Sequence, residues 1–312
     1  MSNTKVIRAD VLGYCMGVRR AVDIALKAVN DVSKNQDFLP LSDRFIAGHE
    51  KVKTLGPLIH NEIALQHLKK CGIGQIDTKN LDQLESKTAP VVILRAHGVA
   101  PETKRKLLQK GCKVIDATCP RVLSSQKRAG SYAAKGFTVI LAGDKNHGEI
   151  IGISGYAEEQ GQSCFVVENR KDAELLLKEN FTNIVAKNHP VVLIAQTTFS
   201  PEEYEAISII LKNELPKIKI LHTICSATYQ RQQALRELCK KVDGVIVIGG
   251  KNSANTRRLY VNAQRWITNS FVVHVEQASE IPSTFYTLKT VGITAGASTP
   301  DELIDEVEAS FN

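Results

Sequence analysis

Long apolar runs, aromatic residues and closely spaced cysteine pairs are scarce in this sequence of 312 residues. No apolar run approaches the roughly 18 residues of a transmembrane helix. The N-terminal stretch MSNTKVIRADVLGYCMG lacks the apolar core of a secretory signal. We therefore expect a cytoplasmic protein with no membrane partner. Its seven cysteines are then reduced thiols, better suited to metal binding or catalysis than to disulfides.

Nucleic-acid and nucleotide signatures are also missing. Aromatic residues make up 5% of the chain and no basic–aromatic motif occurs, which argues against a nucleic-acid partner. There is no P-loop, and GGKNSAN at 249–255 is too short for a dinucleotide fingerprint, so we expect no bound NAD or ATP. The net charge of +7 is spread along the chain. It serves either solubility or the binding of an anionic ligand.

What the sequence does contain is three blocks that each recur at intervals of roughly 100 residues. One is a buried-type strand followed by a polar loop, proline and acidic residues: VVILRAHGVAPET (91–103), VVLIAQTTFSPEE (191–203) and TVGITAGASTPDE (290–302). A second ends in polar residues: GPLIHNE (56–62), GDKNHGE (143–149) and GGKNSAN (249–255). The third runs strand, cysteine, helix: VLGYCMGVRRAV (11–22), VIDATCPRVLSS (114–125) and LHTICSATYQRQ (221–232).

These repeats predict an α/β fold of three pseudo-repeated domains with small parallel sheets, at 1–116, 117–221 and 222–312. Ligands of such sheets lie outside the carboxyl ends of the strands. We therefore expect a trefoil whose polar loops meet at one central point. Ser200 and Thr299 each precede a proline and are predicted to cap the helices that follow.

Three cysteines, Cys15, Cys119 and Cys225, occupy one repeat column, each where a helix is predicted to begin. The helix dipole there favours the thiolate, the form that binds metal. Three thiolates leave one coordination position open. A 4Fe–4S cluster is favoured over zinc, which stays an alternative, because C-x2-C pairs are absent. The other cysteines are expected to be buried or semi-exposed apolar side chains: Cys71, Cys112, Cys164 and Cys239.

The polar loops supply hydroxyls, amides and imidazoles suited to phosphate binding: His60, His97, His147, Thr197, Thr198, Ser253, Asn255 and Ser298. Glu149 is a carboxylate among these loops with a histidine two residues before it. Like charges from a phosphate and an anionic cluster favour its protonated form, so Glu149 is the candidate proton donor. Asp116, which precedes Cys119, is expected to form a turn.

The motifs in order are G-Y-C-M-G-V-R-R-A, H-N-E, R-A-H-G-V, D-A-T-C-P, N-H-G-E, Q-T-T, I-C-S-A-T-x-x-R-Q, K-N-S-A-N and T-A-G-A-S. From about residue 6 to 305 the chain resembles the 4-hydroxy-3-methylbut-2-enyl diphosphate reductase family. The resemblance implies a three-lobed trefoil around a central cluster. It also implies reductive dehydroxylation of that diphosphate to isopentenyl and dimethylallyl diphosphate, the last step of the non-mevalonate isoprenoid pathway. Electrons would come from an external ferredoxin or flavodoxin.

The resemblance also assigns roles to single residues. Cys15, Cys119 and Cys225 match the family's cluster ligands, Glu149 the proton donor, and Thr197 the threonine near the substrate hydroxyl. The positions that match substrate binding are His60, His97, His147, Thr197, Thr198, Ser253, Ala254, Asn255 and Ser298. Ala254 stands where the family often has a second serine, so only its backbone N–H could donate. Gly148 stands where some members have proline, and little effect is expected there.

Two functions of other classes remain as alternatives. A non-catalytic iron–sulfur sensor would keep the three cysteines without needing Glu149 or the phosphate loops. A zinc hydrolase of phosphate esters would hold zinc in place of iron and sulfide.

Overall fold

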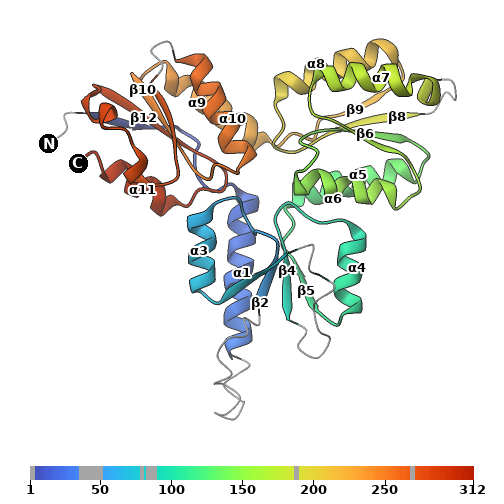
Figure 1. Ribbon diagram of the computed structural model, residues 1–312, viewed down its shortest axis with the longest axis horizontal. Helices are drawn as coiled ribbons and strands as arrows, with labels where there is room; N and C mark the ends of the chain where they lie inside the picture. The colour runs from blue at the N-terminus through green and yellow to red at the C-terminus, as the bar shows by residue number, and fades with distance from the viewer. Residues whose placement is uncertain (1–3, 35–51, 78–80, 82–89, 186–189, 268–270) are drawn as a thin grey trace. The chain divides into compact units, whose positions relative to one another are not determined.

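The computed structural model describes residues 4–34, 52–77, 81, 90–185, 190–267 and 271–312. These residues form three small parallel sheets of four strands with helices packed on them (Figure 1). The α/β class and the three parallel sheets predicted from the repeats are confirmed. The chain divides into two compact units, described separately: Met1–Val52 with Pro57–Gln75 and Ser226–Asn312, and Lys53–Gly56 with Ile76–Cys225. The trefoil stays a prediction, and so do the domain boundaries at 116/117 and 221/222.

One sheet of the second unit has the order β7 (Cys164–Val167), β6 (Thr138–Ala142), β8 (Val191–Ala195) and β9 (Lys219–Leu221). Its helices are α5 (Pro120–Ala133), α6 (Gly148–Glu158), α7 (Arg170–Val185) and α8 (Pro201–Glu214). Figure 1 shows α5 and α6 on one face and α7 and α8 on the other. Successive strand residues point to opposite faces. Thus Val139 and Leu141 pack with α5 and α6, whereas Ile140 and Ala142 pack with α7 and α8.

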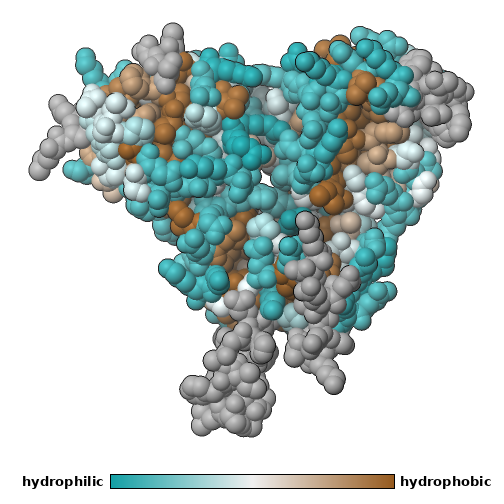
Figure 2. Space-filling view, viewed as in Figure 1, coloured by the Kyte–Doolittle hydropathy of each residue, from teal (hydrophilic) through white to brown (hydrophobic). Residues whose placement is uncertain are grey.

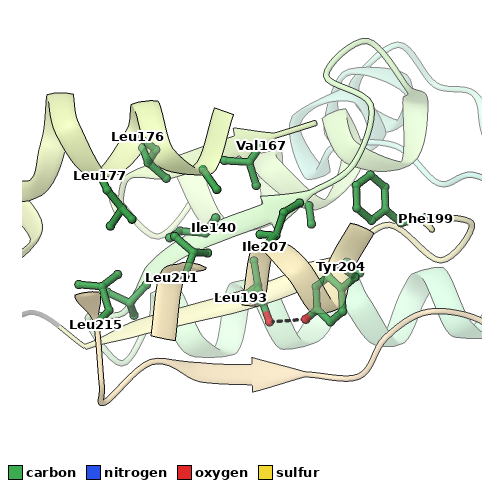
Figure 3. Packing of buried hydrophobic residues seen from close by; sticks show 14 residues of the cluster. Ile140, Val167, Leu176, Leu177, Leu193, Phe199, Tyr204, Ile207, Leu211 and Leu215 are labelled. Carbon is green, nitrogen blue, oxygen red and sulfur yellow. Dashed lines mark hydrogen bonds between the residues drawn. The ribbon is translucent and has the colours of Figure 1, made fainter. Parts of the chain in front are cut away.

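A buried tyrosine ties α8 to this sheet. The hydroxyl group of Tyr204 lies 3.2 Å from the carbonyl oxygen of Leu193 (Figure 3). It also lies 2.7 Å from the carbonyl oxygen of Leu221. Its ring packs among the apolar side chains of α7, α8 and the strands. Because the carbonyls belong to β8 and β9, Tyr204 fixes α8 against the two strands whose carboxyl ends lead to Thr197 and Cys225.

A second sheet has the order β3 (Ile73–Ile76), β2 (Val52–Leu55), β4 (Val91–Leu94) and β5 (Lys113–Asp116). The helices of this region are α3 (Glu62–Lys70) and α4 (Pro101–Gln109). Leu55, Val92, Leu94 and Leu107 form part of one buried cluster, which packs α4 onto the sheet. The carboxyl end of β4 leads into the R-A-H-G turn, and the carboxyl end of β5 leads to Cys119.

The third sheet has the order β1 (Lys5–Arg8), β12 (Thr290–Ala295), β10 (Gly244–Ile248) and β11 (Val272–Val275). Its helices are α9 (Ser226–Cys239), α10 (Ala254–Trp266) and α11 (Asp301–Ala309), with 3-10 turns at Ala278–Glu280 and Ser283–Thr287; α1 (Met16–Lys34) follows β1. Lys5 pairs with Thr290 in parallel register. Strand β1 therefore does not belong with the rest of the predicted first domain, 1–116, because it is the fourth strand of the C-terminal sheet.

The predicted helix caps are half correct. Ser200 caps α8, since its hydroxyl oxygen accepts from the N–H of Glu203 at 3.3 Å, and Pro201 is the first helical residue. The prediction for Thr299 is wrong. Its hydroxyl donates to the carbonyl oxygen of Ile248 at 3.0 Å, and α11 begins at Asp301, one residue later than expected. The Thr299 hydroxyl therefore binds the end of β10 instead of capping α11.

In the part of the chain that the structure describes, no helix is both long and apolar enough to cross a membrane. On the face drawn in Figure 2, hydrophilic residues cover much of the described surface and the hydrophobic residues lie in interrupted patches.

Candidate functional site

One hydrogen bond recurs at all three cysteines of the repeat column. In each copy the cysteine N–H donates to the carbonyl of the second residue past the carboxyl end of a strand. The pairs are Cys15 to Ala297 at 3.1 Å, Cys119 to Ala96 at 3.0 Å and Cys225 to Thr197 at 2.8 Å. A helix begins at the residue after each cysteine: Met16, Pro120 and Ser226. The predicted helix starts are confirmed, and the backbone presents each thiol in the same way.

All seven cysteines are unbridged, as expected from the sequence. Burial raises the pKa of Cys164 and Cys239 to about 11 and also raises that of Cys112, so these thiols stay neutral at physiological pH. The three column cysteines are half-buried and each lies at a helix N-terminus. Soft thiol donors in this setting fit an iron–sulfur cluster.

Glu149 and Thr197 form a buried pair in the second unit. The side chain of Glu149 is 1% exposed, and that of Thr197 is 6% exposed. One carboxylate oxygen of Glu149 accepts from the Thr197 N–H at 2.7 Å, and the other accepts from the Thr197 hydroxyl at 2.8 Å. Thr197 also accepts from the Cys225 N–H through its own carbonyl. A single residue therefore connects the candidate acid to a candidate cluster ligand.

Two imidazoles lie close to that pair within the same unit. His147 caps α6, because its Nδ1 accepts from the Glu149 N–H at 3.2 Å. The rings of His97 and His147 pack edge to face with their centroids 5.2 Å apart. Thr198 accepts from the side-chain amide of Gln196 at 3.0 Å, which fixes its hydroxyl beside Thr197. The second unit thus brings Glu149 together with two of the three candidate histidines, His97 and His147.

The first unit holds the other candidate binding residues. The Ser298 hydroxyl donates to the backbone carbonyl of His60 at 3.1 Å, so these two loops lie side by side. A Cβ built on Gly250 would lie 2.5 Å from that carbonyl oxygen, so only glycine fits there. Ser253 caps α10, and its oxygen accepts from the Thr256 N–H at 3.3 Å.

Asn255 is a buried polar residue in the first turn of α10. Its side chain is 7% exposed, and its Nδ2 has no hydrogen-bond partner among the described residues. A buried amide without a partner is costly, so such a group is suited to donate to a ligand. Ala254 is the first residue of α10, and the backbone N–H groups at this end of a helix have no partner within the helix.

Sequence reasoning missed several residues that shape these loops. Gln196 binds the Asp144 N–H through its side-chain oxygen at 2.9 Å, and so ties the loop after β8 to the loop after β6. Arg231 of α9 is buried and donates to the carbonyl of Gly13, two residues before Cys15, at 2.5 Å. Gly148 matters more than expected, because the guanidinium of Arg95 lies directly against it. Arg95 and Gln196 each directly follow a strand, β4 and β8, but the repeat blocks align Arg95 with Ala195 and gave no signal for either residue.

The protein is therefore an α/β protein with three parallel sheets. Unbridged cysteines, histidines and hydroxyl residues lie in the loops that follow its strands. Within that class, the chain belongs to the LytB protein family, whose model matches residues 6–312. The family resemblance stated from the motifs is confirmed.

Relatives along nearly the whole chain carry one enzyme name. The 4-hydroxy-3-methylbut-2-enyl diphosphate reductase of Treponema denticola is 46% identical over 97% of both chains. The Aquifex aeolicus protein of that name is 37% identical over 97% of this chain and 94% of its own.

Two solved structures of enzymes with this name also match. One, described as the terminal enzyme of the non-mevalonate pathway, shares 35% identity with a TM-score of 0.63 over 98% of both chains. The reductase of Plasmodium falciparum shares 26% identity with a TM-score of 0.82, over 99% of this chain and 88% of that one.

Proposed function

We propose that this protein is a 4-hydroxy-3-methylbut-2-enyl diphosphate reductase. It removes the allylic hydroxyl of that diphosphate as water and produces isopentenyl diphosphate and dimethylallyl diphosphate. The name carried by relatives that match along nearly the whole chain supports the assignment. The observation that carries it is the buried Glu149–Thr197 pair, whose threonine is also hydrogen-bonded to Cys225.

Cys15, Cys119 and Cys225 would hold a 4Fe–4S cluster, which supplies two electrons and one iron with an open position. The four remaining cysteines match no repeat column, and burial keeps three of them neutral: Cys112, Cys164 and Cys239. Reduced thiols fit a cytoplasmic setting, and an external ferredoxin or flavodoxin is the proposed donor of the electrons.

Glu149 is the proposed proton donor. As the C–O bond breaks, the leaving oxygen takes a proton from the Glu149 carboxyl and departs as water. Two electrons enter the allyl group, and one further proton adds at either of its ends, which gives the two products. Thr197 holds both carboxyl oxygens of Glu149, and its hydroxyl can accept as well as donate. The pair therefore keeps its geometry whether Glu149 is protonated or not.

The diphosphate is the proposed ligand of the imidazoles and of the helix N-termini. His97 and His147 offer ring N–H groups in the second unit. In the first unit the proposed donors are His60, Ser253, Asn255, Ser298 and the backbone N–H of Ala254. The buried Asn255 amide without a partner and the N-terminus of α10 are suited to an anion. Thr198 lies beside Thr197 and is assigned to the substrate as well.

Anaerobic turnover tests the proposal. Protein purified without oxygen is expected to contain iron and acid-labile sulfide and to convert the hydroxylated diphosphate to both products with a reduced viologen as electron donor. Zinc in place of iron, together with release of inorganic phosphate, would show a phosphate-ester hydrolase instead. Full iron and sulfide content with no product would favour the iron–sulfur sensor.

A further inference from the structure

Arg95 is a cation that none of these roles uses. It directly follows β4, and its carbonyl accepts from the Gly98 N–H at 3.0 Å, which closes the turn that carries His97. Its Nε is shielded from solvent and has no hydrogen-bond partner among the described residues. Burial lowers the pKa of Arg95, and no carboxylate offsets the effect. The guanidinium nevertheless stays charged at neutral pH, because arginine does not lose its proton in proteins.

The guanidinium lies between two glycines of the second unit. A Cβ built on Gly148 would lie 2.6 Å from Cζ and 3.1 Å from Nε of Arg95, so the flat group packs directly on the Gly148 backbone. A Cβ on Gly56 would lie 3.1 Å from Nη1. Gly148 is the first residue of α6 and follows His147, whose ring meets that of His97. Arg95 therefore belongs to the turn that carries His97, and its guanidinium packs against the residue that follows His147.

A half-buried positive charge without a counter-charge is unfavourable, and it is relieved when an anion binds. Glu149, the residue after Gly148, has both carboxylate oxygens held by Thr197, and burial is the cause of the pKa shift of Arg95. The turns beside Arg95 carry two imidazoles that can donate hydrogen bonds, and the N-terminus of α6 attracts anions. A guanidinium presents paired N–H donors that match phosphate oxygens. All these features favour a phosphate-bearing ligand.

We propose that Arg95 is a further anion-binding residue of the same site. Its guanidinium supplies the fixed positive charge that draws the diphosphate of the substrate to His97 and His147. This inference rests on the proposed function, because that diphosphate is the anion it requires. The glycines at 56 and 148 help to hold the guanidinium in place, since a side chain at 148 would displace it and one at 56 would crowd it.

The test uses the anaerobically purified holoenzyme and inorganic pyrophosphate as the probe. Arg95→Gln keeps much of the length and loses the charge, whereas Arg95→Lys keeps the charge and loses the planar fork. Arg128→Gln removes an exposed arginine of α5 from the same unit and is the matched control. Arg95→Gln should raise the Kd for pyrophosphate and the KM for substrate about 10- to 100-fold, while kcat changes about threefold or less. Arg95→Lys should recover part of the loss, and Arg128→Gln should match wild type.

The outcomes separate this inference from the proposed function. Wild-type affinity for pyrophosphate and wild-type KM in a folded Arg95→Gln protein would overturn the role of Arg95, while turnover by the wild type would leave the enzyme assignment intact. Absence of turnover in the wild type would overturn the enzyme assignment, and the pyrophosphate series would still test Arg95. If Arg95→Gln does not fold, the lysine variant decides. Weakened pyrophosphate binding then supports the assignment, and unchanged binding refutes it.

Discussion

Replacing Glu149 by glutamine separates its chemical role from its structural role. The glutamine side-chain oxygen can still accept from the Thr197 N–H, and its NH2 group can donate to the Thr197 hydroxyl oxygen, because a hydroxyl works in both directions. Both hydrogen bonds are therefore kept, and the fold and iron content should be close to wild type. The loss of a general acid lowers the rate by about 10²- to 10⁴-fold, which corresponds to about 2.7–5.5 kcal/mol in the barrier.

Steady-state turnover under anaerobic conditions, normalised to iron content, measures this effect. Glu158→Gln is the matched control, because Glu158 is exposed at the end of the same helix and should leave the rate unchanged. Thr197→Ser keeps the hydroxyl and should retain most activity, whereas Thr197→Val removes one of the two bonds to Glu149 and should lower kcat. Turnover of the Glu149→Gln protein within about threefold of wild type, at full iron content, would refute the acid assignment.

Three further outcomes are expected. Cys119→Ser should lose iron and sulfide while its circular dichroism stays native, and a variant with full iron would contradict its assignment as a ligand. Asp116 has a lowered pKa; burial raises it, but hydrogen bonds from Thr118 and a lysine outweigh burial. The carboxylate of Asp116 therefore stabilises the fold above the unfolded pKa of about 3.9, and this stabilisation is lost as pH falls through the folded pKa. The difference in Tm between wild type and Asp116→Asn should close below about pH 4. A Tm difference that does not depend on pH would contradict this. Gly148→Ala should cost about 1–3 kcal/mol of stability by crowding Arg95, and Arg95→Ser should relieve part of that loss in urea unfolding, where additive losses would contradict the packing.

The fold class could be predicted from the sequence because each repeat alternates apolar strands with helices. Strands of continuous apolar residues such as VVLIA and GVIVI have no polar face, and they are buried on both sides as that pattern requires. Strand β1 could not be placed in this way. Its four residues, KVIR, have two apolar residues between two charged ones and fit the edge of any of the sheets, so its pairing with β12 depends on long-range contacts that no local pattern encodes.

The candidate site was predictable where residue type and repeat column agreed. Asp116 forms the expected turn, with one carboxylate oxygen accepting from the Thr118 N–H at 3.0 Å. The double contact of Glu149 with Thr197 follows from tertiary structure, because 48 residues separate the two positions. Arg95 was overlooked because its column holds three chemically different residues, the others being Ala195 and Thr294. A repeat column whose residues share no chemistry predicts no common role, so the one copy that carries an arginine does not stand out.

The pairing of β1 with β12 bears on how this chain is made. Lys5 meets its partner Thr290 only after synthesis has passed β12. At about 5–20 residues per second, β1 waits roughly 15–60 seconds for its sheet. During synthesis, the loop that carries Cys15 therefore lacks its hydrogen bond to the Ala297 carbonyl until Ala297 has emerged. Any truncation before β12 removes the carbonyl that accepts from the Cys15 N–H as well as one strand of the sheet.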